Sequence, residues 1–323
     1  MPPSGIIWAK GLPGSAERRP IGLAAGEGGR NISNSNGETH AIGNEQTLDL
    51  WPIGNCQASA LIDRAGRMVW GCVPRVDGDP VFSALLDHEG WEDPEARGFW
   101  AIELENVVAV EQHYIRNTPI LVTRQRDAQG NAIETYDFCP RHRHKGRMYR
   151  PVAFVRIVRP VAGSPRIRVR LRPTTSWNAE KVPVSYGSNH IRMVLSYMAM
   201  RVSTNAPIGL ISQESWFRLE ADMHFFMGPD EGFSDALRPA IERMLDDTIL
   251  EWQIWVRGLA IPAEWQEAVI RSAITLKLCQ HEETGAIVAA LTTSIPEHAD
   301  SGRNWDYRYC WIRDAYYTVE ALN

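Results

Sequence analysis

The stretch Arg166-Ile167-Arg168-Val169-Arg170-Leu171-Arg172 alternates arginine with aliphatic residues at a strict period of two. Successive side chains of a β-strand point to opposite faces, so the three aliphatic residues would face a core and the four arginines the other side. A net charge of −5 argues against an anionic polymer as the partner of these arginines. We therefore predict a half-buried strand with an exposed, salt-bridged arginine face.

Similar short runs, separated by turns, occur on both sides of this strand. The hairpin signature Asp63-Arg64-Ala65-Gly66 lies between two of them. Many short strands without helical spacers are typical of an antiparallel β-sandwich, which we predict over residues 47–233. The expected strands are Ala58–Ile62, Met68–Cys72, Phe99–Glu105, Val107–Ile115, Ile120–Arg126, Ala132–Phe138, Val152–Val158, Arg166–Arg172, His190–Ser203 and Phe217–Phe226.

The apolar period changes near Ser234 from two to three and four, which predicts a linker helix within residues 234–261. Pro239 suits its first turn and Gly258 follows its end. Its expected apolar face is Ile241, Met244, Leu245, Thr248, Ile249, Trp252, Trp255 and Val256.

Two further helices are expected. Pro262 would open the first, with Trp265, Val269, Ala273 and Leu276 on one face, and Ala315–Leu322 would begin the second.

The N-terminal residues 1–46 are rich in Gly, Ser, Asn and Pro and show little apolar periodicity. Such a composition cannot bury enough apolar surface to offset the entropy of ordering, so we predict a disordered tail.

The composition bounds the class of protein. The mildly acidic balance excludes a general nucleic-acid-binding surface, and no apolar run reaches the roughly 18 residues that span a bilayer. We expect a soluble, cytoplasmic protein with reduced thiols and no metal, because the five cysteines are scattered and no signal peptide precedes them. The cysteines are Cys56, Cys72, Cys139, Cys279 and Cys310.

A second informative stretch is Asn304-Trp305-Asp306-Tyr307-Arg308-Tyr309-Cys310-Trp311-Ile312-Arg313-Asp314. An aromatic face can pack against the C–H face of a sugar ring, and an Arg beside an Asp offers donors and acceptors for its hydroxyls. The alternative is an ordinary core segment with a local ion pair.

This stretch resembles the substrate-binding loop of glycoside hydrolase family 15, the glucoamylase and trehalase-like family. The segment Gly285–Glu297 also resembles the family's approach to that loop. The resemblance implies that Tyr307, Trp311, Arg313 and Asp314 hold the sugar at the non-reducing end.

The segment from Ile53 to Asp77 resembles the start of the trehalase-like N-terminal β-sandwich found in prokaryotic members of the same family. The resemblance implies a multidomain β + α protein in which residues 262–323 form the first part of an (α/α)6 barrel. Arg75 and Asp77 are further site candidates, in a loop that would reach across the domain boundary. Otherwise Trp70 and Pro74 simply pack the sandwich corner.

The resemblance also implies a function: inverting hydrolysis of α-glucosidic bonds, in maltooligosaccharides or trehalose, from the non-reducing end. Two Glu side chains about 6.5–9.5 Å apart perform this reaction. In the family both lie on later segments, so we predict no catalytic residue in this chain. The alternative is a catalytically inactive, truncated product, a β-sandwich that serves as a folding or carbohydrate-binding module. Neither the choice of sugar nor the oligomeric state follows from the residues.

The basic segment Arg141–Arg147 has two readings. Because some trehalase-like relatives depend on phosphate, it is a candidate phosphate contact; no other cofactor is implied. The alternative is a solvated basic loop between strands.

Overall fold

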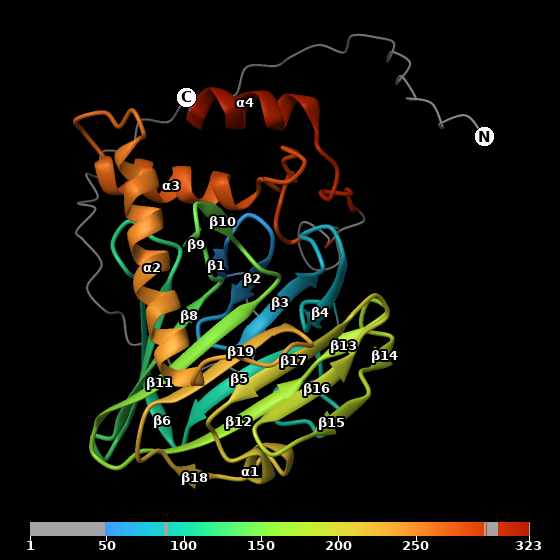
Figure 1. Cartoon of the computed structure of the whole chain (residues 1–323), viewed down its shortest axis with the longest axis vertical. Helices are drawn as coiled ribbons and strands as arrows, with labels where there is room; N and C mark the ends of the chain where they lie inside the picture. Colours follow the sequence, from blue (N-terminus) through green and yellow to red (C-terminus); the bar gives the residue numbers. More distant parts are fainter. Residues whose placement is uncertain (1–48, 87–89, 294, 296–302, 323) are drawn as a thin grey trace, which may run out of the picture. The chain divides into compact units, whose positions relative to one another are not determined.

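The structure, a computed structural model, describes residues 49–86, 90–293, 295 and 303–322. The tail predicted for residues 1–46 lies outside the described residues. In the described chain antiparallel strands dominate, and the longer helices follow them in sequence (Figure 1). The prediction of a mainly antiparallel β fold followed by helices is therefore confirmed.

One antiparallel sheet has seven strands within the described residues, in the order β1-β2-β3-β5-β12-β18, with β4 paired to β3. The predicted hairpin is present between β2 and β3, where the Asp63 carboxylate accepts hydrogen bonds from the backbone N–H groups of Ala65 and Arg67. The strands are β1 (Trp51–Gly54), β2 (Ser59–Ile62), β3 (Met68–Val73), β4 (Asp79–Ser83), β5 (Phe99–Leu104), β12 (Arg166–Arg172) and β18 (Phe217–Arg218).

The second large antiparallel sheet has eight strands in the described chain, in the order β15-β16-β17-β19-β11-β8-β7-β6. The strands are β6 (Val107–Tyr114), β7 (Leu121–Asp127), β8 (Ala132–Phe138), β11 (Phe154–Ala162), β15 (Val184–Tyr186), β16 (His190–Val194), β17 (Ala199–Thr204) and β19 (Met223–Pro229).

Smaller elements complete the β part. Two hairpins join β9 (His142–His144) to β10 (Arg147–Tyr149) and β13 (Thr174–Thr175) to β14 (Glu180–Lys181). A short helix, α1 (Ile208–Ser212), precedes β18.

Two of the predicted strands are each divided in the structure. The range His190–Ser203 forms β16 and β17, joined by a turn closed by a hydrogen bond from the Leu195 N–H to the Met198 carbonyl, 2.9 Å. The range Phe217–Phe226 forms β18 and β19, which belong to different sheets. Strands are therefore present in both ranges, but each range holds two strands, because neither the turn at residues 195–198 nor the change of sheet after Arg218 is marked by the apolar alternation.

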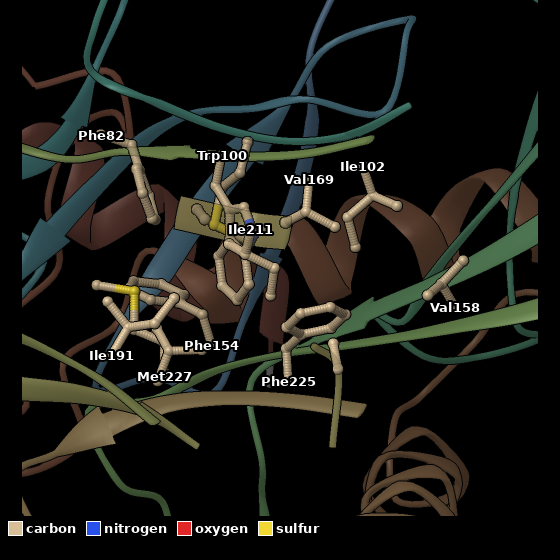
Figure 2. Packing of buried hydrophobic residues seen from close by; sticks show 14 of the residues in the cluster. Phe82, Trp100, Ile102, Phe154, Val158, Val169, Ile191, Ile211, Phe225 and Met227 are labelled. Atoms are coloured by element: carbon tan, nitrogen blue, oxygen red, sulfur yellow. The ribbon is translucent and has the colours of Figure 1, made fainter. Parts of the chain in front are cut away.

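The two sheets face each other across one hydrophobic core. Figure 2 shows side chains of β5 and β12, such as Trp100 and Val169, pointing toward Phe154, Phe225 and Met227 of β11 and β19. All five of these side chains are buried. This arrangement is that of a β-sandwich, in which the inner faces of both sheets supply the core.

A buried ion pair links the sheets at one end of this core. Arg156 of β11 donates to both carboxylate oxygens of Asp137, at 2.7 and 3.2 Å, and also to the carbonyls of Trp100 and Gly66 at 2.6 Å each. Both charged side chains are fully buried. Because Trp100 and Gly66 belong to the other sheet and its hairpin, this guanidinium binds the two layers together.

The arginine face of β12 is salt-bridged as predicted but is not uniformly exposed. Arg168 and Arg170 both pair with Glu103 on the neighbouring strand β5. The Arg170 side chain is only 1% exposed and also contacts the ring of Phe99. The prediction of an exposed face was wrong for Arg170, because the loop containing Trp91 covers it: the Trp91 carbonyl accepts from its guanidinium.

The helix predicted after Ser234 is α2 (Leu237–Arg257), with Pro239 in its first turn and Gly258 as its C-cap. Five residues of the predicted apolar face are buried: Ile241, Leu245, Thr248, Trp252 and Val256. The N-terminal half packs on strands of the eight-stranded sheet, and Trp252 and Val256 pack with β2, β3 and α3. Its role as a linker between domains stays a prediction.

The next helix is α3 (Gln266–Leu278), and its buried face agrees with the predicted one at Ala273 but not at Trp265. Trp265 precedes the helix and is 71% exposed, whereas Ala273, Ile274 and Leu278 are buried. The prediction was wrong at Trp265 because the helix begins after it. The last helix, α4 (Ile312–Leu322), lies beside α3 (Figure 1).

Candidate substrate-binding site

The segment from residue 303 to Trp311 forms a compact turn that leads directly into α4. The indole N–H of Trp311 donates to the backbone carbonyl of Asp306 at 3.1 Å, and the rings of Trp305 and Trp311 meet edge to face with centroids 6.4 Å apart. Asp314 follows in the first turn of α4, where a negative charge complements the helix dipole. The predicted motif therefore forms one local unit.

Within this unit, Asp306 and Arg308 form a two-point ion pair. The Arg308 Nε and Nη2 atoms donate to the two carboxylate oxygens of Asp306 at 2.9 and 2.6 Å. This pair raises the pKa of Arg308, first through the hydrogen bond to Asp306. Asp306 is thus held by an internal partner and shapes the turn.

The four predicted sugar-contacting residues lie at different depths. Tyr307 is half-buried, and its carbonyl accepts a hydrogen bond from the N–H of Ala289 at 2.9 Å. Trp311 is 38% exposed. The side chains of Arg313 and Asp314 are 76% and 39% exposed. The structure thus brings Trp311, Arg313 and Asp314 to the start of one helix and ties Tyr307 to the segment that follows α3.

Asp314 differs from the other carboxylates of this region because no tight ion pair holds it. Its Oδ2 atom has no hydrogen-bond partner in the described chain, and the nearest cation, Arg313 Nη2, is 3.5 Å away. An acceptor and a guanidinium with unused hydrogen-bonding capacity lie side by side here. This is the polar pair that binding of vicinal hydroxyls requires.

The two further candidates, Arg75 and Asp77, occupy the turn between β3 and β4. They form an exposed two-point ion pair with distances of 2.9 and 2.7 Å. The Asp77 carboxylate also contributes to the raised pKa of Arg308, so this turn lies near residues 304–314, the predicted sugar loop. Both side chains are already paired with each other. Their role in a site stays a prediction.

Trp177, in the turn between β13 and β14, is a residue that the sequence analysis missed. The guanidinium carbon of Arg308 lies 5.3 Å from the centroid of its ring, and the ring of Trp70 lies 6.5 Å away on the sandwich. The available signal was Trp177 between Ser176 and Asn178, because a tryptophan within a polar turn calls for an explanation.

The end of α3 is fixed to the sandwich by a cluster of charges around Glu282. Arg141 donates to both carboxylate oxygens at 2.9 Å, and Lys277 and Arg150 lie 2.7 and 3.3 Å away. Burial alone would raise the pKa of Glu282, but the hydrogen bonds from Arg141 and Lys277 outweigh it and lower the pKa to about 2. These charges therefore fix the segment after α3, which leads to the predicted sugar loop, to the sandwich.

The prediction of a solvated basic loop over Arg141–Arg147 was wrong at its start. Arg141 and His142 are buried, and β9 and β10 form a hairpin there rather than an irregular loop. Arg141 is buried because Glu282 neutralises it. The residues Arg143, His144 and Lys145 are exposed, as expected.

A crevice of about 320 Å³ lies at the edge of the sandwich, between β5, β6 and the loop at Trp91. Arg67 stacks on Trp91 and Arg168 on Trp216, with guanidinium carbons 3.6 and 4.7 Å from the ring centroids. Both arginines are also paired with carboxylates. Arginine side chains thus already cover the aromatic faces of Trp91 and Trp216, which disfavours this crevice as a sugar site.

The described residues contain no group of His, Cys, Asp and Glu side chains that could hold a metal ion. Among the described helices, none is long and apolar enough to cross a membrane.

Comparisons with known proteins agree with these features. Residues 46–225 match the family described as "Trehalase-like, N-terminal", and residues 264–323 match "Glycosyl hydrolases family 15". Similar curated proteins include one named Trehalase from Thermoplasma volcanium, 29% identical over 286 residues, and one named Trehalase from Mycolicibacterium smegmatis, 28% identical over 299 residues. Each alignment covers 84% of this chain and 43% of the relative, so the chain spans less than half the length of these proteins. No solved structure matches significantly.

Proposed function

The chain belongs to glycosyl hydrolase family 15 and carries the trehalase-like N-terminal domain, and on this premise we propose that it serves the hydrolysis of trehalose. Tyr307, Trp311, Arg313 and Asp314 would hold one glucose unit at the start of α4. The relatives named Trehalase favour trehalose over the maltooligosaccharides that the family resemblance also allowed.

The observation that carries this proposal is the buried Oδ2 atom of Asp314, which accepts no hydrogen bond within the described chain and lies 3.5 Å from the Arg313 Nη2 atom. A buried acceptor without a partner is uncommon in a folded protein and calls for an explanation. A sugar hydroxyl that donates to the Asp314 carboxylate and accepts from the Arg313 guanidinium would satisfy the hydrogen-bonding capacity of both side chains. The half-exposed ring of Trp311 would cover the apolar face of the same sugar.

We further propose that residues 262–322 form the start of a helical barrel, with α3 and α4 as early members of its ring. The match of residues 264–323 to the family and the contact between α3 and α4 support this arrangement. The exposed apolar residues of α4, including Ile312, Tyr316 and Val319, would then face further helices of that barrel.

Neither the general acid nor the general base is assigned to this chain. A general acid for this reaction needs a carboxyl group with a raised pKa. Near the loop, Asp306 is paired with Arg308 and Asp77 with Arg75, while the pKa of Glu282 is lowered to about 2. The lowered pKa favours the carboxylate state of Glu282, and guanidinium groups hold both aspartates, so these three side chains suit positioning rather than proton donation.

Calorimetric titration of the 323-residue chain with trehalose and with maltotriose tests the proposal. We expect trehalose to bind, and to bind more tightly than maltotriose. Binding of maltotriose alone would assign the site to glucoamylase-type substrates, and binding of neither sugar would refute a working sugar site in this chain.

A parallel NMR assay of trehalose hydrolysis tests the assignment of the acid and base. Inverting hydrolysis releases one α- and one β-glucose, so the initial anomer ratio identifies it. We expect no turnover, and an equal initial release of the two anomers would show that this chain supplies both carboxylates.

A further inference from the structure

We propose that Trp177 of the β-sandwich is a positioning residue for the sugar site, acting through Arg308 and Asp306 to fix the ring of Trp311. The inference that Trp177 affects sugar binding rests on the proposed function, in which Trp311 contacts the sugar. The positioning itself is a property of the folded chain and is tested separately.

The turn that carries Trp177 has an unusual backbone. Ser176, Trp177 and Asn178 have φ values of 54°, 55° and 73°, three consecutive non-glycine residues in the left-handed region. L-residues avoid this region because the β carbon crowds the backbone, and a bulky residue does so most. Such a run persists only where neighbouring groups hold it, and backbone strain of this kind concentrates at functional sites.

Asp79, at the start of β4, is the group that holds this turn. Its carboxylate accepts hydrogen bonds from the backbone N–H groups of Ser176 at 2.6 Å and Trp177 at 2.8 Å, and from the Thr175 hydroxyl at 2.9 Å. Asp79 is itself buried. Three donors on one buried carboxylate fix the orientation of the Trp177 backbone relative to the sandwich.

The Trp177 side chain then meets the sugar loop. Its ring is 38% exposed and lies with the Arg308 guanidinium carbon 5.3 Å from its centroid. A cation at this distance from an indole is attracted by the ring quadrupole. The sandwich therefore contacts the predicted sugar loop through the Trp177 ring. This ring limits how closely the Arg308 guanidinium can approach it, while allowing small sideways shifts.

Two further contacts connect Arg308 to Trp311. Arg308 holds the Asp306 carboxylate with two hydrogen bonds, at 2.9 and 2.6 Å. The backbone carbonyl of the same Asp306 accepts from the Trp311 indole N–H at 3.1 Å. Asp79, Trp177, Arg308, Asp306 and Trp311 thus form one continuous series of contacts from the core of the sandwich to the proposed sugar-stacking ring.

NMR of the tryptophan indole N–H groups in the full chain tests the positioning step without any sugar. The Trp311 signal is identified from its loss in Trp311→Phe. In Trp177→Ala we expect this signal to move toward the position of a solvent-exposed indole, because the bond to Asp306 weakens. In Trp177→Phe, which keeps an aromatic face under Arg308, it should stay near its original position.

Trp265→Ala is the matched control, since Trp265 is an exposed tryptophan that immediately precedes α3 and is not part of this series of contacts. It should leave the Trp311 signal unchanged. An unchanged Trp311 signal in Trp177→Ala, or an equal shift in Trp177→Ala and Trp177→Phe, would overturn the proposal. If Trp177→Ala fails to fold, Arg308→Ala removes the other partner at a half-buried position and must produce the same shift.

Trehalose affinity provides the functional readout. We expect Trp177→Ala and Arg308→Ala each to weaken binding about two- to fivefold, the range that loss of one exposed cation–π contact corresponds to. The double variant should be no weaker than either single one, because both act through the same contact. If the losses of trehalose affinity in the two single variants added up in the double variant, Trp177 and Arg308 would not act through the same contact. Failure of the unaltered chain to bind trehalose would refute the proposed function, while the indole signals would still decide the positioning role.

Discussion

Gly54 in β1 lies directly against Leu278 at the end of α3: a β carbon on Gly54 would be 3.0 Å from the Leu278 Cδ2 methyl group. The same β carbon would lie 3.0 Å from the carbonyl oxygen of Ala58. The sandwich and α3 thus meet at a point where any side chain larger than that of glycine would make contacts shorter than ordinary van der Waals distances on both sides. This contact joins the two parts of the chain that the sequence suggests are separate domains.

We predict that Gly54→Ala destabilises the chain by about 1–3 kcal/mol, the usual effect of inserting a methyl group into a packed core. Urea denaturation gives the free energy of unfolding. Gly209→Ala is the control, because Gly209 lies in α1 and a β carbon there would meet nothing within 4 Å. That variant should be neutral or slightly stabilised. Equal unfolding free energies for Gly54→Ala and the unaltered chain would contradict close packing at Leu278.

Replacing Arg156 by methionine should cost about 3–5 kcal/mol of unfolding free energy, because it leaves the Asp137 carboxylate buried without a counter-charge. The double change of Arg156→Met with Asp137→Leu should recover much of this loss, since it removes both buried charges. Chemical denaturation of the two variants measures the difference. A double variant as unstable as the single one would show that the sheets depend on the guanidinium's bonds to Trp100 and Gly66 rather than on charge balance.

The charge cluster at Glu282 predicts a specific loss of stability in acid. The pKa of Glu282 is lowered from 4.5 to about 2, so the folded state favours the ionised carboxylate. Its contribution is complete above about pH 4.5 and is lost as the pH falls from about 4.5 to about 2, amounting to about 3 kcal/mol. Glu282→Gln should lower the unfolding free energy at pH 7 by about the same amount. In this variant the unfolding free energy should also fall less steeply below pH 4.5.

The control for the acid experiment is Glu95→Gln, which alters an exposed pair with Lys181 on the sandwich surface. Its unfolding free energy should follow that of the unaltered chain at every pH, because exposed ion pairs contribute little. If Glu282→Gln showed the same acid profile as the unaltered chain, Glu282 would not be the residue that couples stability to pH.

For the sugar site we predict that Asp314→Asn weakens trehalose binding about tenfold or more, the effect of losing a hydrogen bond to a charged acceptor. Arg313→Lys should weaken it as well, because an ammonium cannot reproduce the planar fork of a guanidinium. Asp235→Asn is a matched surface control in the turn before α2, where Asp235 pairs loosely with Arg243. Titration calorimetry separates these outcomes, and unaltered affinity in Asp314→Asn would remove Asp314 from the site.

Much of the β part could be predicted from the sequence because its patterns are local. The hairpin at Asp63–Gly66 and the face of α2 from Ile241 to Val256 appear as expected. The divided strands at Leu195–Met198 were missed because alternation continues through a tight turn. Trp265 was misplaced because its apolar character does not reveal that α3 starts one residue later.

By itself the sequence determined the motif at residues 304–314 and the alternation that makes the sandwich, since motif spacing and period two are properties of neighbouring residues. Only the tertiary structure decided that Arg170 is buried, that Glu282 holds three cations, and that Trp177 lies beneath Arg308. Each of these facts depends on residues far apart in the chain: Arg170 and Trp91 are separated by 79 positions, Arg141 and Glu282 by 141, and Trp177 and Arg308 by more than a hundred. Contacts of that range are set by how sheets and helices pack, which no local pattern records.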